Sequence, residues 1–242
     1  MNAIEIKGLS KRYGERTVVD HLTLEVAEGE LFSLLGVNGA GKTTTIKMLS
    51  CLAVPSGGDA AVLGHSVTAE PTAVKAVIAV SPQETAVAAG LTVRENLELI
   101  CGIYGFSTEK TRRRIAELSA LLSLEKEMGK RAGKLSGGYA RRLSIAMALI
   151  SEPRVLFLDE PTLGLDVIAR SDLWEIIRAL KGKITVILTT HYMEEAEALS
   201  DRIGIMKDGK LLVCDTPDAI KAQTGESTIE RAFIKVVKGV GA

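Results

Sequence analysis

Residues 36–43 have the residue types and spacing that bind the phosphates of a nucleotide, GVNGAGKT. Glycines let the backbone curl so that successive N–H groups point inward, and a following helix adds the positive end of its dipole. In the pattern G-x-x-x-x-G-K-[ST], the lysine reaches the β- and γ-phosphates and the hydroxyl ligates Mg²⁺. The segment therefore predicts a P-loop. We expect the nucleotide to contact Gly36, Asn38, Gly39, Ala40, Gly41, Lys42, Thr43 and Thr44.

Two adjacent carboxylates, Asp159 and Glu160, directly follow the apolar run 155–158. A carboxylate at the end of a buried parallel strand lies beside the ligand crevice of an α/β sheet. Asp159 is placed to hold Mg²⁺ through water. Glu160 could align or deprotonate an attacking water, which is typically worth about 10²–10⁴-fold in rate. An acidic pair in a plain strand-to-turn junction is the alternative, and the P-loop argues against it.

The predicted elements place both motifs at strand ends. Residues 31–35 form a short apolar run, typical of a strand buried on both faces, and it leads directly into the glycine-rich segment. From Lys42 the apolar spacing becomes helical. Similar runs at 155–158 and 184–188 flank a helical pattern at 168–180. Strands that alternate with helices predict a parallel sheet with right-handed crossovers. A dinucleotide-binding turn would instead need G-x-G-x-x-G and no lysine.

Three further segments have clear patterns. Residues 4–6 and 22–26 alternate in the manner of half-buried strands. Residues 202–206 and 210–213, joined through Asp-Gly, predict a hairpin. Between 91 and 150 no strand pattern occurs, and 111–124 has one apolar stripe opposite three arginines at 112–114. We expect an inserted helical lobe with those arginines in solvent.

The bulk composition excludes several classes of protein. The 242 residues are 46% hydrophobic and 25% charged, which is ordinary for a globular chain. Thirty basic and thirty acidic residues cancel, and aromatics are only 4%, so nothing indicates a nucleic-acid surface. The three cysteines fit no zinc spacing. No apolar stretch approaches the roughly 18 residues of a membrane span.

A second glycine-containing segment, LSGGY at 135–139, opens an amphipathic stretch. It is either a donor-rich helix start that binds an anion or a capped helix start that binds nothing. It resembles the signature motif of the ABC ATPases, which usually ends in glutamine where this chain has Tyr139. The resemblance implies that Ser136, Gly137 and Gly138 contact nucleotide.

Other residues match the same family in order along the chain. Tyr13 resembles the aromatic residue that stacks on adenine, and a half-buried turn tyrosine is the alternative. Gln83 occupies the place of the Q-loop glutamine, which senses Mg²⁺ and the attacking water while its loop couples to a membrane partner. Asp166 resembles the D-loop aspartate at a dimer interface, and it also suits a helix N-cap. His191 matches the switch histidine that contacts γ-phosphate.

The resemblance implies an α/β fold of the P-loop NTPase (RecA-like) type. Its core would have a mainly parallel sheet, an N-terminal antiparallel β subdomain and an inserted α-helical subdomain. We expect an ABC ATPase domain over 1–220, with the α/β parts at 1–90 and 151–220, the helical insert at 91–150, and a C-terminal extension at 221–242. That extension ends in a short amphipathic segment whose packing partner, core or second protein, stays open.

The function that this resemblance implies is Mg²⁺-dependent ATP binding and hydrolysis that powers transport. Two such ATPase subunits, identical or different, would pair head-to-tail and drive a separate transmembrane permease subunit from the cytoplasmic face of a membrane. Residues 158–166 and 189–202 resemble an exporter branch that handles drugs, antibiotics, lipids or ions. Two alternatives differ in class: a soluble ABC ATPase acting on nucleic acid or ribosomes, and a nucleotide switch that does not hydrolyse. The neutral charge disfavours the first, and the intact Glu160 and His191 disfavour the second.

Overall fold

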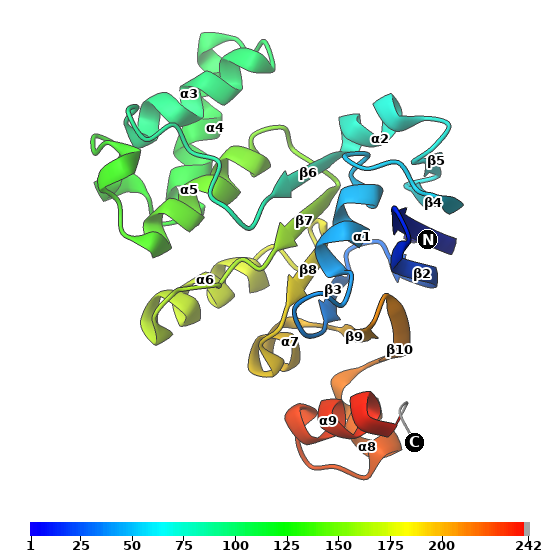
Figure 1. Cartoon of the computed structure of the whole chain (residues 1–242). Coiled ribbons are helices and arrows are strands. Elements are labelled where there is room, and N and C mark those ends of the chain that lie inside the picture. The colour runs from blue at the N-terminus through cyan, green and yellow to red at the C-terminus, as the bar shows by residue number, and fades with distance from the viewer. Residues whose placement is uncertain (240–242) are drawn as a thin grey trace.

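A computed structural model describes residues 1–239 and contains a six-stranded sheet in the order β10-β9-β3-β8-β7-β6. Five of these strands run parallel and β10 pairs antiparallel with β9. The strands are β3 (Leu31–Leu35), β6 (Ile78–Ser81), β7 (Val155–Asp159), β8 (Thr185–Thr190), β9 (Arg202–Lys207) and β10 (Lys210–Asp215). The predicted apolar runs are the central strands because helices or a second sheet cover both faces (Figure 1).

The predicted hairpin is present as β9 and β10. Its turn residues Asp208 and Gly209 have φ of 48° and 81°, the left-handed backbone that a two-residue hairpin turn needs. The β8 strand runs two residues beyond the predicted 184–188 and ends at Thr190. This extension brings the end of β8 level with the end of β7.

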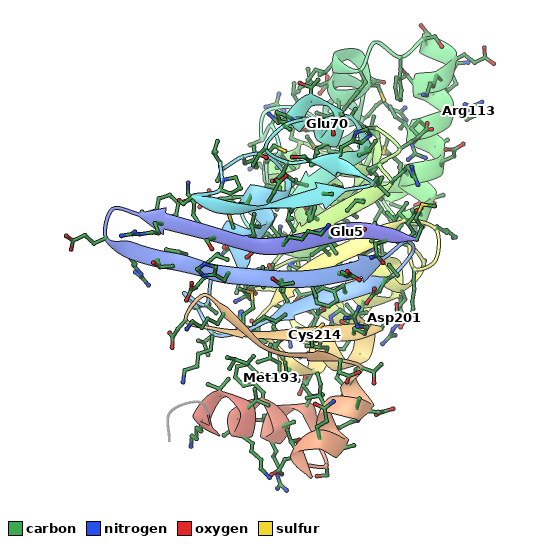
Figure 2. The ribbon with its side chains drawn as sticks, turned by 90° about the vertical axis from the view of Figure 1, so that its right-hand side faces the viewer. Glu5, Glu70, Arg113, Met193, Asp201 and Cys214 are labelled. Atoms are coloured by element: carbon green, nitrogen blue, oxygen red, sulfur yellow. The ribbon has the colours of Figure 1, made fainter. Side chains whose placement is uncertain are left out.

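A second, antiparallel sheet has the order β2-β1-β4-β5. It consists of β1 (Asn2–Tyr13), β2 (Arg16–Ala27), β4 (Gly57–Val62) and β5 (His65–Ser66). The β1–β2 hairpin is far longer than the predicted strands and extends along one side of the molecule (Figure 2). Its buried side chains pack with helices α1 (Lys42–Leu49) and α2 (Pro71–Val77) on one face of the core sheet.

The opposite face of the core sheet is covered by helices. They are α3 (Val93–Ile103), α4 (Thr108–Leu121), α5 (Gly137–Leu149) and α6 (Val167–Arg178), with short 3₁₀ turns at Glu125–Glu127 and Ala132–Lys134. Their apolar sides share one core cluster with the sheet residues Leu156, Leu158 and Leu188. The absence of strand patterns between 91 and 150 therefore corresponds to helices.

One part of the arginine prediction is wrong. Arg112 and Arg113 are exposed, and Figure 2 shows Arg113 pointing away from α4. Arg114 is mostly buried instead, with 19% of its side chain exposed. Its guanidinium donates to the carbonyl oxygen of Leu149 and to Glu117. A long arginine stem can lie on apolar surface while its head bonds a carbonyl at a helix C-terminus.

The C-terminal segment packs on the core. Helices α8 (Pro217–Thr224) and α9 (Ile229–Gly239) meet α7 (Met193–Leu199), and Met193 lies in the layer between them and the core strands (Figure 2). Phe233 packs with Leu35 in this cluster, and the Lys207 ammonium donates to the carbonyl of Val237 at 2.8 Å. The described part of the tail thus covers the edge of the sheet. Over residues 1–239, no helix is both long and apolar enough to cross a bilayer.

One carboxyl group in the interior carries a stability cost. Glu195 on α7 is fully buried, and its Oε1 accepts a hydrogen bond from Trp174 Nε1 at 3.0 Å. Its Oε2 has no hydrogen-bond partner within the described chain. Burial raises the pKa of Glu195, although the nearby hydroxyls of Thr190 and Thr162 oppose that rise. The folded chain therefore holds this carboxyl in its protonated form to a higher pH than the unfolded chain does.

We predict that Glu195→Gln stabilises the protein increasingly as the pH rises. The unfolded glutamate loses its proton near the ordinary pKa of about 4.3, whereas burial raises the pKa of the folded one, so it keeps its proton to a higher pH. The wild-type free energy of unfolding should therefore fall relative to the variant by up to about 1.4 kcal/mol per pH unit until the folded pKa is reached. Urea unfolding of both chains at about pH 5, 6 and 7 measures this. A difference that does not change with pH contradicts the prediction.

Candidate active site

The glycine-rich segment lies between the end of β3 and the start of α1. Gly39 and Gly41 have φ of 84° and 103°, which only glycine adopts readily. A Cβ at Gly41 would lie 2.7 Å from the carbonyl oxygen of Val18, so no side chain fits there. No side chain caps the start of α1. The N–H groups of its first turn are therefore donors available to an anion.

The Lys42 ammonium lies beneath this loop with only 5% of its side chain exposed. It donates to the carbonyl oxygen of Gly36 at 2.7 Å and lies 3.2 Å from Glu160 Oε1. A buried ammonium needs such acceptors because it has lost its water. The contact links the loop after β3 to the residue after β7.

The two carboxylates lie at the end of β7 and each is held by β8. Asp159 Oδ1 accepts from the hydroxyls of Thr43 at 3.0 Å and Thr189 at 2.5 Å. Glu160 has φ of 48°, and its N–H bonds to both the carbonyl and the hydroxyl oxygen of Thr189. Glu160 Oε2 lies 2.7 Å from His191 Nδ1. Residues from three separate segments, at the ends of β3, β7 and β8, therefore meet at one edge of the sheet.

Lys42, Thr43, Glu160 and His191 line a pocket of about 510 Å³, within the usual size range for small-molecule sites. A hollow of about 710 Å³ elsewhere, between α4 and the starts of β7 and β8, does not include Lys42. Tyr13 and Gln83 also line the 510 Å³ pocket, and the Tyr13 side chain is 51% exposed at its rim. The 510 Å³ pocket is lined in full by Tyr13, Arg16, Val18, Asn38, Gly39, Ala40, Gly41, Lys42, Thr43, Thr44, Gln83, Glu160, Leu163 and His191.

The signature residues lie elsewhere on the chain. Ser136 and Gly138 line a separate hollow of about 260 Å³ together with Asp166. Ser136 and Asp166 are also helix N-caps, since their side chains accept from the N–H groups of Tyr139 and Ala169. One chain therefore does not bring its own signature residues to its own P-loop pocket.

The loop that carries Gln83 is held by an arginine that the sequence analysis did not identify. Arg141 on α5 is buried and donates to the carbonyl oxygens of Pro82 at 2.6 Å and Gln83 at 2.5 Å. Burial lowers the pKa of Arg141, and the negative charge of Asp159 opposes that effect. Thr189 was missed in the same way. Both residues act through contacts between distant segments, which leave no local sequence pattern.

The predicted metal ligands suit a hydrated Mg²⁺. Thr43 and Asp159 are in hydrogen-bond contact, and Gln83 lines the same pocket as Thr43. Mg²⁺ prefers oxygen ligands, keeps several waters and shares the phosphates of its nucleotide. One hydroxyl, one carboxylate and one amide therefore fit that ion. In the described residues, no three His, Cys, Asp or Glu side chains gather into a self-sufficient metal cage.

Comparison with known proteins shows the family to which this sequence is related. The chain matches the ABC transporter family over residues 19–163 and an AAA domain family over 131–196. It is 43% identical to the daunorubicin resistance ATP-binding protein DrrA2 of Streptomyces coeruleorubidus, over 94% of this chain and 71% of that protein. It is 44% identical to the Nod factor export ATP-binding protein I of Rhizobium sp. (strain N33), over 90% of this chain and 72% of that protein.

Solved structures agree with the fold. The ATP-binding subunit of an ABC transporter superposes with a TM-score of 0.85 at 30% identity, over 97% of this chain and 99% of that one. The predicted P-loop NTPase fold is thereby confirmed. The sequence matches and the shared fold, together with the P-loop pocket, lead to one conclusion: this chain belongs to the ABC transporter family, as an ATP-binding subunit with ATPase activity.

Proposed function

We propose that this protein hydrolyses ATP with Mg²⁺ to drive export through a separate transmembrane permease subunit. The observation that carries the proposal is the meeting of Lys42, Asp159, Glu160 and His191 at one edge of the sheet. The names of its relatives, which include drug-resistance and Nod factor export ATP-binding proteins, support the direction of transport.

The side chains divide the chemistry between them. The loop at 36–43 and Lys42 bind the phosphates, and Tyr13 offers its ring to the base. Thr43, Gln83 and Asp159 would hold Mg²⁺, which would supply positive charge to the phosphates. Glu160 faces Lys42 with one oxygen and His191 with the other. This pair of contacts fixes the direction of the carboxylate, so it can orient a water and accept its proton.

The separation of the signature residues favours a paired enzyme. Ser136, Gly137, Gly138 and Asp166 lie away from the P-loop pocket of their own chain. Val167 and Ile168, beside Asp166, are 77% and 76% exposed. Apolar side chains this exposed at a capped helix start suit a protein interface. A second ATPase subunit, packed head-to-tail, would place its signature segment over the ATP of the first.

An apolar groove suits the membrane partner. It has a volume of about 460 Å³, is lined by Leu52, Ile103, Tyr104 and Met147, and reaches Pro82 beside Gln83. Leu52 and Ile103 are 67% and 71% exposed. A cytoplasmic segment of the permease would fit here, and we infer that this protein works on the cytoplasmic face of a membrane. The zero net charge gives no support to a role on nucleic acid.

We predict that Glu160→Gln lowers the ATPase rate by about 10²–10⁴-fold, because an amide cannot accept the proton of water. Binding of a fluorescent ATP analogue should remain, since Lys42 and the loop are unchanged. Gel filtration with ATP should show this variant as a dimer, whereas Lys42→Ala should stay monomeric. Wild-type hydrolysis by Glu160→Gln would refute the catalytic role, and a monomer with bound ATP would count against pairing.

We predict that Ile103→Glu, in the groove, releases the protein from membranes of cells that express it. A buried charge at an interface typically costs 2 kcal/mol or more, so membrane-bound protein should fall by roughly tenfold or more. The ATPase activity of the purified chain should be unchanged. Ile234→Glu is the control, because Ile234 is 43% exposed on α9, outside the groove. Equal membrane retention of the Ile103→Glu and control chains excludes the groove as the docking site.

A further inference from the structure

Thr189 links the two carboxylates of the proposed active site. It is fully buried on β8 and lies opposite Asp159 in the β7–β8 ladder. Its hydroxyl is 2.5 Å from Asp159 Oδ1 and 3.0 Å from the backbone nitrogen of Glu160. No other side chain of the described residues is hydrogen-bonded to both Asp159 and the Glu160 backbone.

The direction of these bonds is fixed by the number of protons. The Glu160 N–H can only donate and an ionised Asp159 can only accept. The single hydroxyl proton of Thr189 must therefore point to Asp159, while its lone pair accepts from Glu160. Thr43 donates to the same Oδ1 atom. Both hydroxyls thus occupy one oxygen of Asp159, and neither occupies Oδ2, which stays available to Mg²⁺ or its water.

The second contact holds an unfavourable backbone conformation. Glu160 has φ of 48°, in the left-handed region that is disfavoured for residues with a Cβ. Its N–H donates to the carbonyl oxygen of Thr189 at 3.1 Å and also to the Thr189 hydroxyl oxygen. Such conformations persist only where several surrounding interactions hold the backbone in place. The hydroxyl therefore helps to keep Glu160 turned toward Lys42 and His191.

We infer that Thr189 is a positioning residue for hydrolysis, whose hydroxyl aligns Asp159 for Mg²⁺ and Glu160 for water. The inference rests on the proposed roles of those two acids. It concerns the hydroxyl and not the shape of the side chain, because the backbone carbonyl of Thr189 would still bond Glu160 after Thr189→Val. Removing the hydroxyl should therefore leave the fold intact and weaken the alignment of Asp159 and Glu160.

The test compares Thr189→Val with two matched variants. Thr189→Ser restores the hydroxyl at the same place. Thr185→Val makes the same change on the same strand, where the buried hydroxyl only accepts from the N–H of Gly29. Three quantities are measured for each purified full chain: the gain in affinity for a fluorescent ATP analogue when Mg²⁺ replaces EDTA, the ATPase kcat, and the urea midpoint.

Thr189→Val should lose about tenfold or more in the Mg²⁺-dependent affinity gain and in kcat, as is typical when a partner of a metal ligand is removed. Affinity in EDTA should not change. Thr189→Ser should stay within about twofold of wild type, and Thr185→Val should match wild type in both readouts. If Thr189→Val is too unstable to purify, Thr189→Ala removes the hydroxyl without adding a methyl group.

The inference is overturned if Thr189→Val keeps the wild-type Mg²⁺-dependent affinity gain and the wild-type kcat. It is also overturned if Thr185→Val loses as much as Thr189→Val in both quantities. Asp159→Asn separates this failure from that of the proposed function. If Asp159→Asn abolishes the Mg²⁺ effect while Thr189→Val does not, only the inference about Thr189 fails. If Asp159→Asn also behaves as wild type, the proposed Mg²⁺ site itself is wrong.

Discussion

The contact between the Lys42 ammonium and the Glu160 carboxylate is the constraint on which the rest of the site depends. Both groups are almost fully buried, so each needs the other and further polar partners to offset the loss of water. The parallel sheet supplies those partners because β3, β8 and β7 are neighbours and end at the same edge. Figure 1 shows α1 starting at this edge, which adds the positive end of a helix.

The position of the signature residues is the reason for the proposed pairing of two chains. The pocket provides cations and hydroxyls around the phosphates but none of the signature residues, which lie on another face of the same chain. The helices that carry the signature segment and Asp166 share one core with the sheet. Arg141 bonds the Gln83 loop to the signature helix. If the membrane partner docks beside that loop, as we propose, its movements would reach the signature helix through Arg141.

The sequence predicted those parts of the structure that local patterns encode. Residues 31–35 were identified as a strand because both faces are buried, and the glycine-rich loop after them needs backbone angles that few residues allow. The parts that were wrong or missed depend on contacts between distant segments. Arg114 reaches the end of another helix, and Thr189 meets the neighbouring strand. A single sequence contains no periodicity that reports such pairs.

The tail shows the same limit. Its apolar spacing predicted a short amphipathic segment but not its packing partner, and the structure shows this segment as helix α9, packed against α7 and the sheet edge. Helix α7 begins two residues after His191, the proposed switch residue, and packs against α9 of the tail. The division of the chain at about residue 220 remains our proposal, since α8 and α9 share a cluster with core strands.

The central claim is that ATP is hydrolysed between two chains, and the ATPase rate per subunit across a range of protein concentrations tests it most directly. Sedimentation velocity under the same conditions gives the fraction of dimer. Paired sites predict that the rate per subunit rises with concentration in step with the dimer fraction and then levels off. A constant rate per subunit at concentrations where the chain sediments as a monomer would contradict the account.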